Sequence, residues 1–347
     1  MSFNTNNLVD GIEYDYITRT SINQGILKTT GFVNDENVNS EGNWSLGLLQ
    51  MDFFYRRKPW YAGQFVRKIL PKFEISSESV ILFFSTLLNG LKRKLLTVLV
   101  RDVDETFLNS TIQVPIKDNG DVNWEFITEF VAELEAQRIA ELKAYLQVSG
   151  LDDYELSKDE LEVLQRYSSL EFKDFDTLEI FRVKNTSSIL SCDIVENSGR
   201  IPYLCASSEN NGVSSYIEYD DKFLEKGNCI FIGGKTFVVT YQENNFYSND
   251  SHNLALYLKK EIARTKLNQL YIATCVFKSL SHKYSWGNSV SSIKIKTDKI
   301  SLPVKNGEPD FGIMGTFISA IQKLVIKDVV LYADKKIDAT KKVVSKK

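Results

Sequence analysis

The sequence predicts an α+β protein made of two copies of one β-rich domain, each followed by a long helix. Three observations predict it. A short motif occurs twice, short strand-like runs lie between turn signals, and two segments carry apolar residues at helical spacing. At 347 residues, with 43% hydrophobic content, the chain is long enough for two or three domains with real cores.

The repeated motif reads VPIKDNGDVNWEFITEFV at 114–131 and LPVKNGEPDFGIMGTFI at 302–318. Each copy has an apolar residue, proline, an apolar residue and lysine, then a polar turn, an aromatic residue and a helical apolar pattern. Pro115 and Pro303 are 188 positions apart. We expect the proline to end a strand, the turn to redirect the chain and the aromatic residue to anchor the base of a helix.

Further matches lie upstream of this motif in the same order. They are Tyr16–Thr20 with Tyr203–Ser207, Asn23–Gly25 with Asn210–Gly212, Gly42-Asn43 with Gly227-Asn228, and Pro59–Ala62 with Asn245–Ser248. Dipeptides such as Asn-Gly are ordinary turn signals, so no single match is strong. Their common offset of 185–188 residues indicates an internal duplication.

Each copy is expected to contain short strands and a helix before its long helix. The plainest strands, rich in β-branched and aromatic residues, are 65–70, 236–242 and 291–296. The apolar segments 79–91 and 268–280 are expected to be helical.

The segment that follows each proline motif carries a helical apolar stripe. In 310–342 the apolar spacing of three and four residues indicates a coiled-coil seam. A helix of that length would extend about 50 Å at a rise of 1.5 Å per residue. The alternative is a surface helix that lies on its own domain, but the length exceeds what one small domain can cover. We therefore expect the two long helices to pair and to hold the globular parts apart.

The charge is unevenly distributed along the chain. Residues 129–162 hold ten acidic and three basic residues, a local charge of −7, so the rest of the chain is +4 against a total of −3. Basic clusters occur at 56–58, 67–68 and 92–94. The overall pI of about 5.7 therefore does not argue against a nucleic-acid partner.

Cysteine and histidine usage predicts no metal site. Four cysteines, at 192, 205, 229 and 275, form no CxxC pair, and there are only two histidines. Buried free thiols in a reducing cytoplasm are the expected state. No apolar run approaches the roughly 20 residues that span a bilayer, and the first residues do not resemble a secretory signal.

No catalytic motif is recognisable, so we expect no catalytic residue and no cofactor. GxGxxG, the P-loop, HExxH, GxSxG and the Asn-Pro-Pro-aromatic signature of DNA amino-methyltransferases do not occur in a fitting context. The Gly-Gly-Lys at 233–235 lacks the earlier glycine of a P-loop and leads into a strand.

With these features the sequence resembles the DNA-specificity (S) subunits of type I restriction–modification systems, and particularly the short subunits of type IIB systems. The second copy carries the resemblance most clearly, in segments 201–218, 226–258 and 302–311. The first copy matches more weakly, at 14–26 and 114–126. One departure is that 168–199 has no counterpart before residue 10.

The resemblance implies two pseudo-repeated target-recognition domains separated by two long antiparallel coiled-coil helices. The implied domains are 1–122 (first recognition domain), 123–165 (first spacer helix region), 166–308 (second recognition domain) and 309–347 (second spacer helix and tail). The implied function is non-catalytic, cytoplasmic recognition of double-stranded DNA at a bipartite site. Methyltransferase subunits, alone or with restriction subunits, would be the catalytic partners.

Base reading needs side chains with paired donors and acceptors, and backbone binding needs cations interleaved with aromatics. On this basis we predict DNA contacts at Arg19, Asn23, Gln24, Lys28, Tyr55, Arg56, Arg57, Lys58, Tyr61, Ser207, Ser208, Asn210, Asn211, Lys235, Tyr247, Lys283 and Tyr284. The competing interpretations are that the Asn-Gly loops are plain turns and that 55–61 is a solvated charge run. His252 is expected to be structural.

The acidic, apolar-striped helices are predicted to bind partner helices. The residues expected at that contact are Ile127, Phe130, Leu134, Phe317, Ile321 and Leu324. The other class of function compatible with a duplication is a two-headed protein-interaction scaffold without DNA specificity. The target sequence, and the choice between a type I and a type IIB system, stay open.

Overall fold

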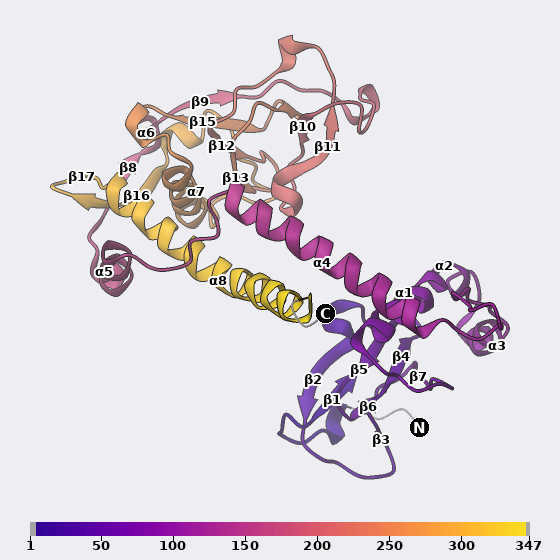
Figure 1. Ribbon diagram of the computed structural model, residues 1–347. Helices are drawn as coiled ribbons and strands as arrows, with labels where there is room; N and C mark the ends of the chain where they lie inside the picture. Colours follow the sequence, from indigo (N-terminus) through magenta and orange to yellow (C-terminus); the bar gives the residue numbers. More distant parts are fainter. Residues whose placement is uncertain (1–4, 345–347) are drawn as a thin grey trace. The chain divides into compact units, whose positions relative to one another are not determined.

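The computed structural model describes the backbone of residues 5–344 and the side chains of 5–339 (Figure 1). The chain divides into two compact units. Unit 1 comprises Met1–Leu142 together with Lys335–Lys347, and unit 2 comprises Lys143–Asp334. Each unit combines small β-sheets with helices, so the predicted α+β class is confirmed.

Unit 1 contains a four-stranded sheet in the order β2-β1-β6-β3 and a three-stranded sheet in the order β5-β4-β7. Its strands are β1 (Tyr14–Ile17), β2 (Ile26–Thr30), β3 (Val38–Asn39), β4 (Asn43–Gly47), β5 (Asp52–Arg56), β6 (Trp60–Ala62) and β7 (Val66–Ile69). Its helices are α1 (Glu78–Gly90), α2 (Lys92–Leu95), α3 (Val103–Leu108) and most of α4 (Trp124–Val148).

Unit 2 contains three sheets, in the orders β11-β10-β14, β13-β12-β15-β9 and β17-β16-β8. Its strands are β8 (Phe172–Asp176), β9 (Phe181–Asn185), β10 (Ile201–Leu204), β11 (Val213–Ile217), β12 (Cys229–Ile232), β13 (Val239–Gln242), β14 (Tyr247–Ser248), β15 (Leu254–Leu258), β16 (Lys299–Lys305) and β17 (Glu308–Pro309). Its helices are α5 (Lys158–Arg166), α6 (Thr177–Ile180), α7 (Lys266–Leu280) and most of α8 (Phe311–Val344).

The strand pairing shows that the two units repeat one plan. Tyr16 pairs with Lys28 across β1 and β2, and Tyr203 pairs with Ser215 across β10 and β11. Both hairpins shift register by one residue immediately afterwards. A parallel strand then joins the other side of each hairpin, β6 beside β1 and β14 beside β10. The second sheets match as well, with β5-β4-β7 repeated as β13-β12-β15.

The segment 168–199, which has no counterpart in the first copy, supplies extra strands to unit 2. Strand β9 extends the sheet beside β15, and β8 pairs with β16. In the part of unit 1 that the structure describes, the matching sheet ends at β7. The first copy of the fold therefore has the smaller second sheet of the two.

The repeated proline motif makes the same hydrogen bonds in both units, but the expected strand end at the proline is wrong. Pro303 lies inside β16, and Pro115 lies outside the strands of unit 1. The backbone N–H of Asn123 donates to the carbonyl of Pro115 at 2.9 Å, and that of Asp310 donates to the carbonyl of Pro303 at 2.9 Å. The side-chain oxygens of Asn123 and Asp310 each accept from the backbone N–H three residues further on, at 3.1 Å. Each motif thus closes a turn and caps the helix that follows.

The aromatic residue at the start of each long helix packs against its own unit. Trp124 lies 5.1 Å from Phe73 and 5.8 Å from Phe84, between ring centroids, at the base of α4. Phe311 is packed against the main core of unit 2. These contacts fix the base of each helix on the preceding sheet, as the motif predicts.

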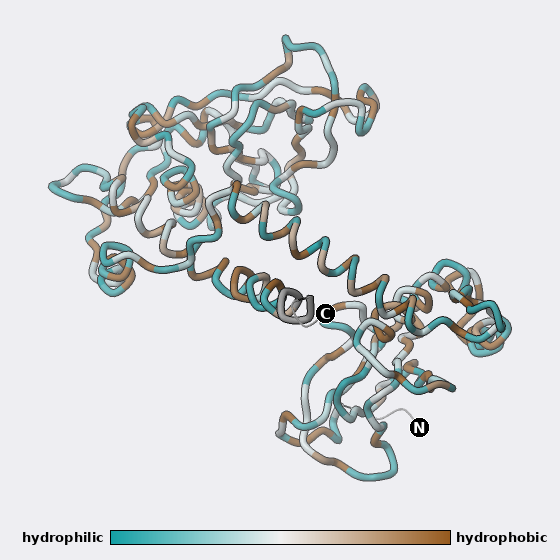
Figure 2. The backbone as a smooth tube through the Cα atoms, in the orientation of Figure 1, coloured by the Kyte–Doolittle hydropathy of each residue, from teal (hydrophilic) through white to brown (hydrophobic). Residues whose placement is uncertain are grey.

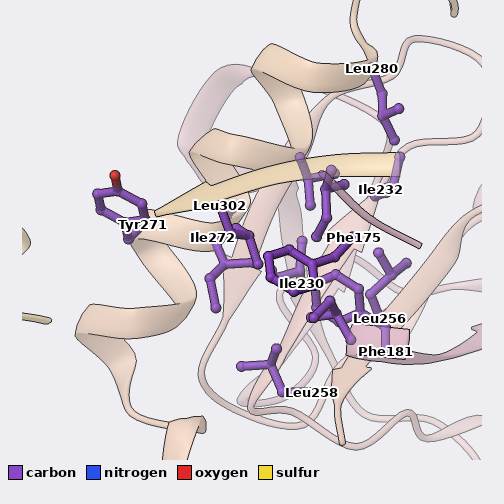
Figure 3. Packing of buried hydrophobic residues seen from close by; sticks show 14 of the residues in the cluster. Phe175, Phe181, Ile230, Ile232, Leu256, Leu258, Tyr271, Ile272, Leu280 and Leu302 are labelled. Atoms are coloured by element: carbon purple, nitrogen blue, oxygen red, sulfur yellow. The ribbon is translucent and has the colours of Figure 1, made fainter. Parts of the chain in front are cut away.

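The main core of unit 2 lies between its sheets and α7 (Figure 3). Phe175, Phe181, Ile230 and Leu256 point into it from four strands, and Ile272 enters from α7. Full burial of an aliphatic or aromatic side chain of this kind contributes about 1.5–3 kcal/mol. Unit 1 has an equivalent core in which β4, β5 and α1 meet.

Helix α4 buries one stripe and exposes another. The buried residues follow one another at spacings of four, eight and seven: Ile127, Val131, Ile139 and Leu146. Phe126, Phe130 and Leu134 remain 48%, 47% and 42% exposed. Figure 2 shows the resulting alternation of apolar and polar residues along the helix.

The long helices α4 and α8 contact each other within each unit. In unit 1, Lys336 of α8 forms an ion pair with Glu135 of α4 at 2.5 Å. In unit 2, Lys143 of α4 pairs with Asp334 of α8 at 2.8 Å. Further along in unit 2, Lys323 pairs with Asp153 at 2.7 Å. The residue number rises from 143 to 153 on one segment and falls from 334 to 323 on the other, so the two segments run antiparallel.

Two strand predictions need correction. The segment 291–296 is not a strand, because Ser291 starts a helical turn that ends in a 3-10 helix, Ile295–Thr297. The carbonyl of Ser291 accepts from the N–H of Ile295 at 3.0 Å, and its hydroxyl accepts from that of Lys294 at 3.2 Å. The strand predicted at 236–242 begins only at Val239, because Phe237 has φ +55° and closes a tight turn.

The thiols are all free, but they are not all buried as expected. Cys229 is buried, Cys205 and Cys275 are partly exposed, and Cys192 is exposed. Burial raises the pKa of Cys229 and that of Cys275 to about 12, so neither is a reactive thiolate at neutral pH.

Candidate DNA interface

The same unusual turn joins the first two strands of each repeat. In unit 1, Asn23 and Gln24 have φ values of 47° and 53°, followed by Gly25 at 78°. In unit 2, Asn210 and Asn211 have φ values of 46° and 53°, followed by Gly212 at 82°. Three successive left-handed residues are costly for side chains other than glycine, and asparagine tolerates this region best. We call these segments, 23–25 and 210–212, the left-handed turns.

Side-chain amides hold each left-handed turn together. Asn23 Nδ2 donates to the carbonyl of Ile26 at 3.2 Å, and Asn210 Nδ2 donates to that of Val213 at 3.0 Å. Asn211 Nδ2 also donates to the carbonyl of Tyr241 at 3.0 Å. The amide N–H groups of Asn23, Asn210 and Asn211 therefore stabilise the turns, as the interpretation of these loops as turns predicts. The side chains nevertheless stay exposed.

A buried side chain from the second sheet supports each left-handed turn from below. Arg56 Nη2 donates to the carbonyl of Gln24 at 2.5 Å, and Arg56 Nε donates to the Ser45 hydroxyl at 2.9 Å. Arg56 is only 2% exposed, and burial lowers its pKa to about 10 against the opposing influence of Asp15. Arg56 is thus a structural cation whose donors are used inside unit 1.

Four of the predicted DNA contacts are buried in the same way. Arg56 and Tyr284 are 2% and 8% exposed, and Tyr61 and Tyr247 are 0% exposed. Their polar groups bond within the protein: Tyr247 donates to the carbonyl of Tyr219 at 2.7 Å, and Tyr284 donates to Asp298. Side chains in this position cannot reach DNA, so we leave these four out of the proposed interface. The aromatic–basic alternation at 55–61 mostly reflects strand packing.

The remaining cations of that segment face solvent. Arg57 and Lys58 are exposed, and Arg57 pairs with Glu78 at the surface. Tyr55 is half-buried and packs edge-on against Trp44, with ring centroids 5.0 Å apart. The two cations are therefore placed as a phosphate-binding pair would be, and an exposed ion pair holds Arg57 only weakly.

The other predicted DNA contacts lie mostly at the surface of their own unit. Lys28, Ser208, Lys235 and Lys283 are exposed, and Ser207 is half-buried. Lys235 pairs with Asp250 at 3.0 Å, and Lys283 pairs with Asp298 at 3.0 Å. These lysines are oriented by carboxylates while their ammonium groups remain within reach of solvent.

Around each left-handed turn, neighbouring loops pack backbone to backbone. A Cβ at Gly47 would lie 3.0 Å from the Cα of Arg19, and one at Gly233 would lie 2.9 Å from the Cα of Ala206. In unit 2 the hydroxyl of Thr236 also donates to the carbonyl of Ala206 at 2.9 Å. This close packing favours glycine at both positions.

Three exposed residues outside the set of predicted DNA contacts lie in loops of the two units. Phe65 is 42% exposed, with φ +61°, and lies under the guanidinium of Arg19. The side chain of His252 is 68% exposed and bonds to Asp250. Trp286 is 75% exposed in the turn closed by the Ser285–Asn288 bridge. The offset of 187 residues could have matched Phe65 with His252, but a positive φ and a position beside a turn cannot be read from sequence.

The residues predicted to contact partner helices divide into core and surface. Ile127 is fully buried in the core of unit 1, and Phe317 stacks on Tyr167 with ring centroids 4.1 Å apart. Phe130, Leu134 and Leu324 are 47%, 42% and 47% exposed. Only these three present a free apolar surface, while Ile321 is half-buried.

Between residues 5 and 344 the structure shows no cluster of three metal-ligating side chains. None of the helices described combines the length and the apolar character needed to cross a bilayer.

Comparison with known proteins agrees with this duplicated architecture. The family model of the type I restriction modification DNA specificity domain matches residues 1–144 and 170–331. The specificity subunit S.BcgI of a type II restriction enzyme from Heyndrickxia coagulans is 28% identical over 154 residues, which is 44% of this chain and 44% of that protein. The match thus spans less than half of the relative's length.

Among solved structures, the S subunit of a type I restriction–modification system from M. genitalium superposes with a TM-score of 0.50. The two share 13% sequence identity, and the alignment covers 98% of this chain and 89% of that one. At this identity the likeness concerns the fold alone.

The two units thus repeat one sheet–turn–helix arrangement with exposed polar loops. The chain belongs to the family of type I restriction modification DNA specificity domains and carries the domain twice. The family resemblance predicted from sequence is confirmed.

Proposed function

We propose that this chain is the DNA-recognition subunit of a restriction–modification complex, in which each unit reads one half of a bipartite site. The observation that carries the proposal is the left-handed turn built twice on one scaffold, with different exposed side chains around it. Two readers of different half-sites require the same backbone scaffold with different exposed side chains. Methylation and cleavage would come from partner chains.

The proposed division of labour follows the predicted boundaries. Residues 1–122 and 166–308 act as the readers, and the helical regions 123–165 and 309–347 act as the spacer. Support comes from the capped starts of α4 at Trp124 and of α8 at Phe311, each held to its proline motif by the same hydrogen bonds. Paired helices keep a fixed length, whereas a flexible linker could not hold two half-sites in register.

We further propose that the exposed apolar residues of the long helices bind helices of a methyltransferase subunit. On α4, Phe126 stacks on Phe130 with ring centroids 5.9 Å apart and an interplanar angle of 10°. On α8, Val325, Val329 and Tyr332 are 73%, 38% and 49% exposed at spacings of four and three. Apolar side chains at such spacing on a helix are typical anchors for another helix.

A titration of DNA with the chain and its co-expressed modification subunit, run at two salt concentrations, tests this proposal. A reader with six to ten phosphate contacts loses on the order of 10³–10⁵ in affinity between 50 and 200 mM salt. Binding that ignores salt would instead favour a protein-interaction scaffold.

A domain exchange tests the two-reader arrangement. Replacing residues 200–300 with those of another family member should alter one half of the recognised sequence and leave the other half intact. A change in both halves would contradict the assignment of one half-site to each unit.

A further inference from the structure

One pair of exposed residues occupies the same place in the two units. Leu46 of β4 faces Arg67 of β7, and Ile232 of β12 faces Leu254 of β15. The residues two positions before Arg67 and Leu254 are Phe65 and His252, which therefore correspond. Both are exposed.

In unit 1 this place holds a cation stacked on a ring. The guanidinium carbon of Arg19 lies 5.5 Å from the centroid of the Phe65 ring, and Arg19 is exposed. Stacking uses the face of the guanidinium and leaves the N–H groups in its plane pointing outward. A fork of parallel N–H donors suits the O6 and N7 acceptors of guanine in the major groove.

In unit 2 the corresponding place holds an acceptor. Ala206 replaces Arg19, so no guanidinium is present there. His252 Nδ1 lies 2.7 Å from Asp250 Oδ1, and Lys235 Nζ lies 3.0 Å from Asp250 Oδ2. Because a carboxylate only accepts, Nδ1 carries the proton of the neutral ring, and the exposed Nε2 is left with its lone pair.

The orientation of this imidazole is fixed at several points. The backbone N–H of His252 also donates to Asp250 Oδ1 at 2.9 Å. A Cβ at Gly234 would lie 2.3 Å from the carbonyl oxygen of His252, so the backbone at His252 packs tightly against Gly234. An exposed side chain held in one tautomer and one place is suited to reading a single base edge.

We propose that Arg19 and His252 are the corresponding base-reading residues of the two units, with opposite hydrogen-bonding character. Arg19 selects guanine in one half-site. His252 accepts from the exocyclic amino group of adenine or cytosine in the other half-site. This inference rests on the proposed function and adds to it the class of base that each unit requires.

The test uses the chain in complex with its modification subunit. DNA with randomised half-sites is selected by the wild-type complex and by the Arg19→Ala, His252→Ala and His282→Ala variants. His282 is the matched control, because it is exposed and lies outside the His252–Asp250–Lys235 group.

The wild-type complex should select a guanine in one half and an adenine or cytosine in the other. Arg19→Ala should relax that guanine position alone, and His252→Ala should relax the amino-bearing position alone. Arg19→Ala and His252→Ala should each lose about tenfold in affinity for the wild-type site. His282→Ala should select the wild-type sequence, and all variants should remain folded and keep the bound subunit.

Three results would overturn the inference while leaving the proposed function standing. Uniform weakening on every sequence, with a lower salt slope, would mean phosphate contacts. Relaxation of the same half by both variants would contradict the correspondence. Selection unchanged from wild type would mean that neither residue reads a base. A wild-type complex that selects no sequence would instead refute the proposed function itself.

Discussion

Arg56 and Gln242 perform the same task with different chemistry. Arg56 lies on the strand that follows Gly47, and Gln242 lies on the strand that follows Gly233. Each donates from a side-chain nitrogen to the carbonyl of the second residue of a left-handed turn. The distances are 2.5 Å from Arg56 to Gln24 and 2.9 Å from Gln242 to Asn211. Each also bonds to a neighbouring hydroxyl, that of Ser45 or Thr240.

Arg56→Gln is therefore expected to be tolerated better than Arg56→Ala. Glutamine copies the support that unit 2 uses, whereas alanine leaves a turn carbonyl and a buried hydroxyl without a donor, at a cost of about 2–3 kcal/mol. Thermal unfolding of both variants measures the difference. If alanine and glutamine destabilise equally, the hydrogen bond to Gln24 does not support the turn.

Lengthening both spacer helices should lengthen the gap between the recognised half-sites. Seven residues inserted before Tyr145 and seven at the matching level of α8 add about 10 Å, or roughly three base pairs. Methylation mapping of the target reads the gap directly. An active complex with an unchanged gap would contradict the spacer role, and an insertion in α4 alone, which breaks the pairing, should abolish activity.

Replacing Phe130 and Leu134 together by serine should weaken association with the modification subunit. Exposed apolar anchors of this kind contribute about 2 kcal/mol or more, so at least a tenfold loss of affinity is expected. Pull-down with the tagged subunit measures it. Glu133→Ser, exposed on the same helix, is the control that should bind normally. Equal binding by all variants would place the partner elsewhere.

The Asp250 carboxylate should stabilise unit 2 except at strongly acid pH. Burial opposes its ionisation, but hydrogen bonds from His252 and Lys235 outweigh burial and lower its pKa from 3.8 to about 2. A depressed pKa gives a contribution that is present above about pH 4 and is lost as pH falls toward 2.

Urea unfolding of Asp250→Asn against wild type, between pH 5 and pH 2.5, tests this dependence. The stability difference should be largest at pH 5 and shrink below pH 4. Asp118→Asn, in an exposed turn of unit 1, should differ little from wild type throughout. A difference for Asp250→Asn that stays constant to pH 2.5 would show that the ionised carboxylate contributes nothing.

The duplication and the long helices were predictable because they depend on repeated local signals. The proline motif carries its own turn residues and helix cap, so its structure follows from the sequence around Asn123 and Asp310. The strand prediction for 291–296 is wrong because local hydrogen bonds also act there. The hydroxyl and carbonyl of Ser291 start a helical turn within an alternating run.

The interface was less predictable, because residue type does not reveal burial. Arg56 looks like a DNA-binding cation beside Arg57, yet strand alternation turns one inward and the other outward. His252 was expected to be structural, although the loop that presents it corresponds to that of Phe65. The burial of Arg56 depends on which face of β5 packs inward, and residue type alone does not reveal this.

The division of the long helices between the units also sets an order of folding during synthesis. Unit 2 is one continuous stretch, Lys143–Asp334, whereas unit 1 combines the start of the chain with Lys335–Lys347. The Glu135–Lys336 ion pair of unit 1 therefore forms only after nearly the whole chain has left the ribosome. The half that is translated first is therefore completed last, and a chain cut before Lys335 would keep unit 2 whole while lacking a segment of unit 1.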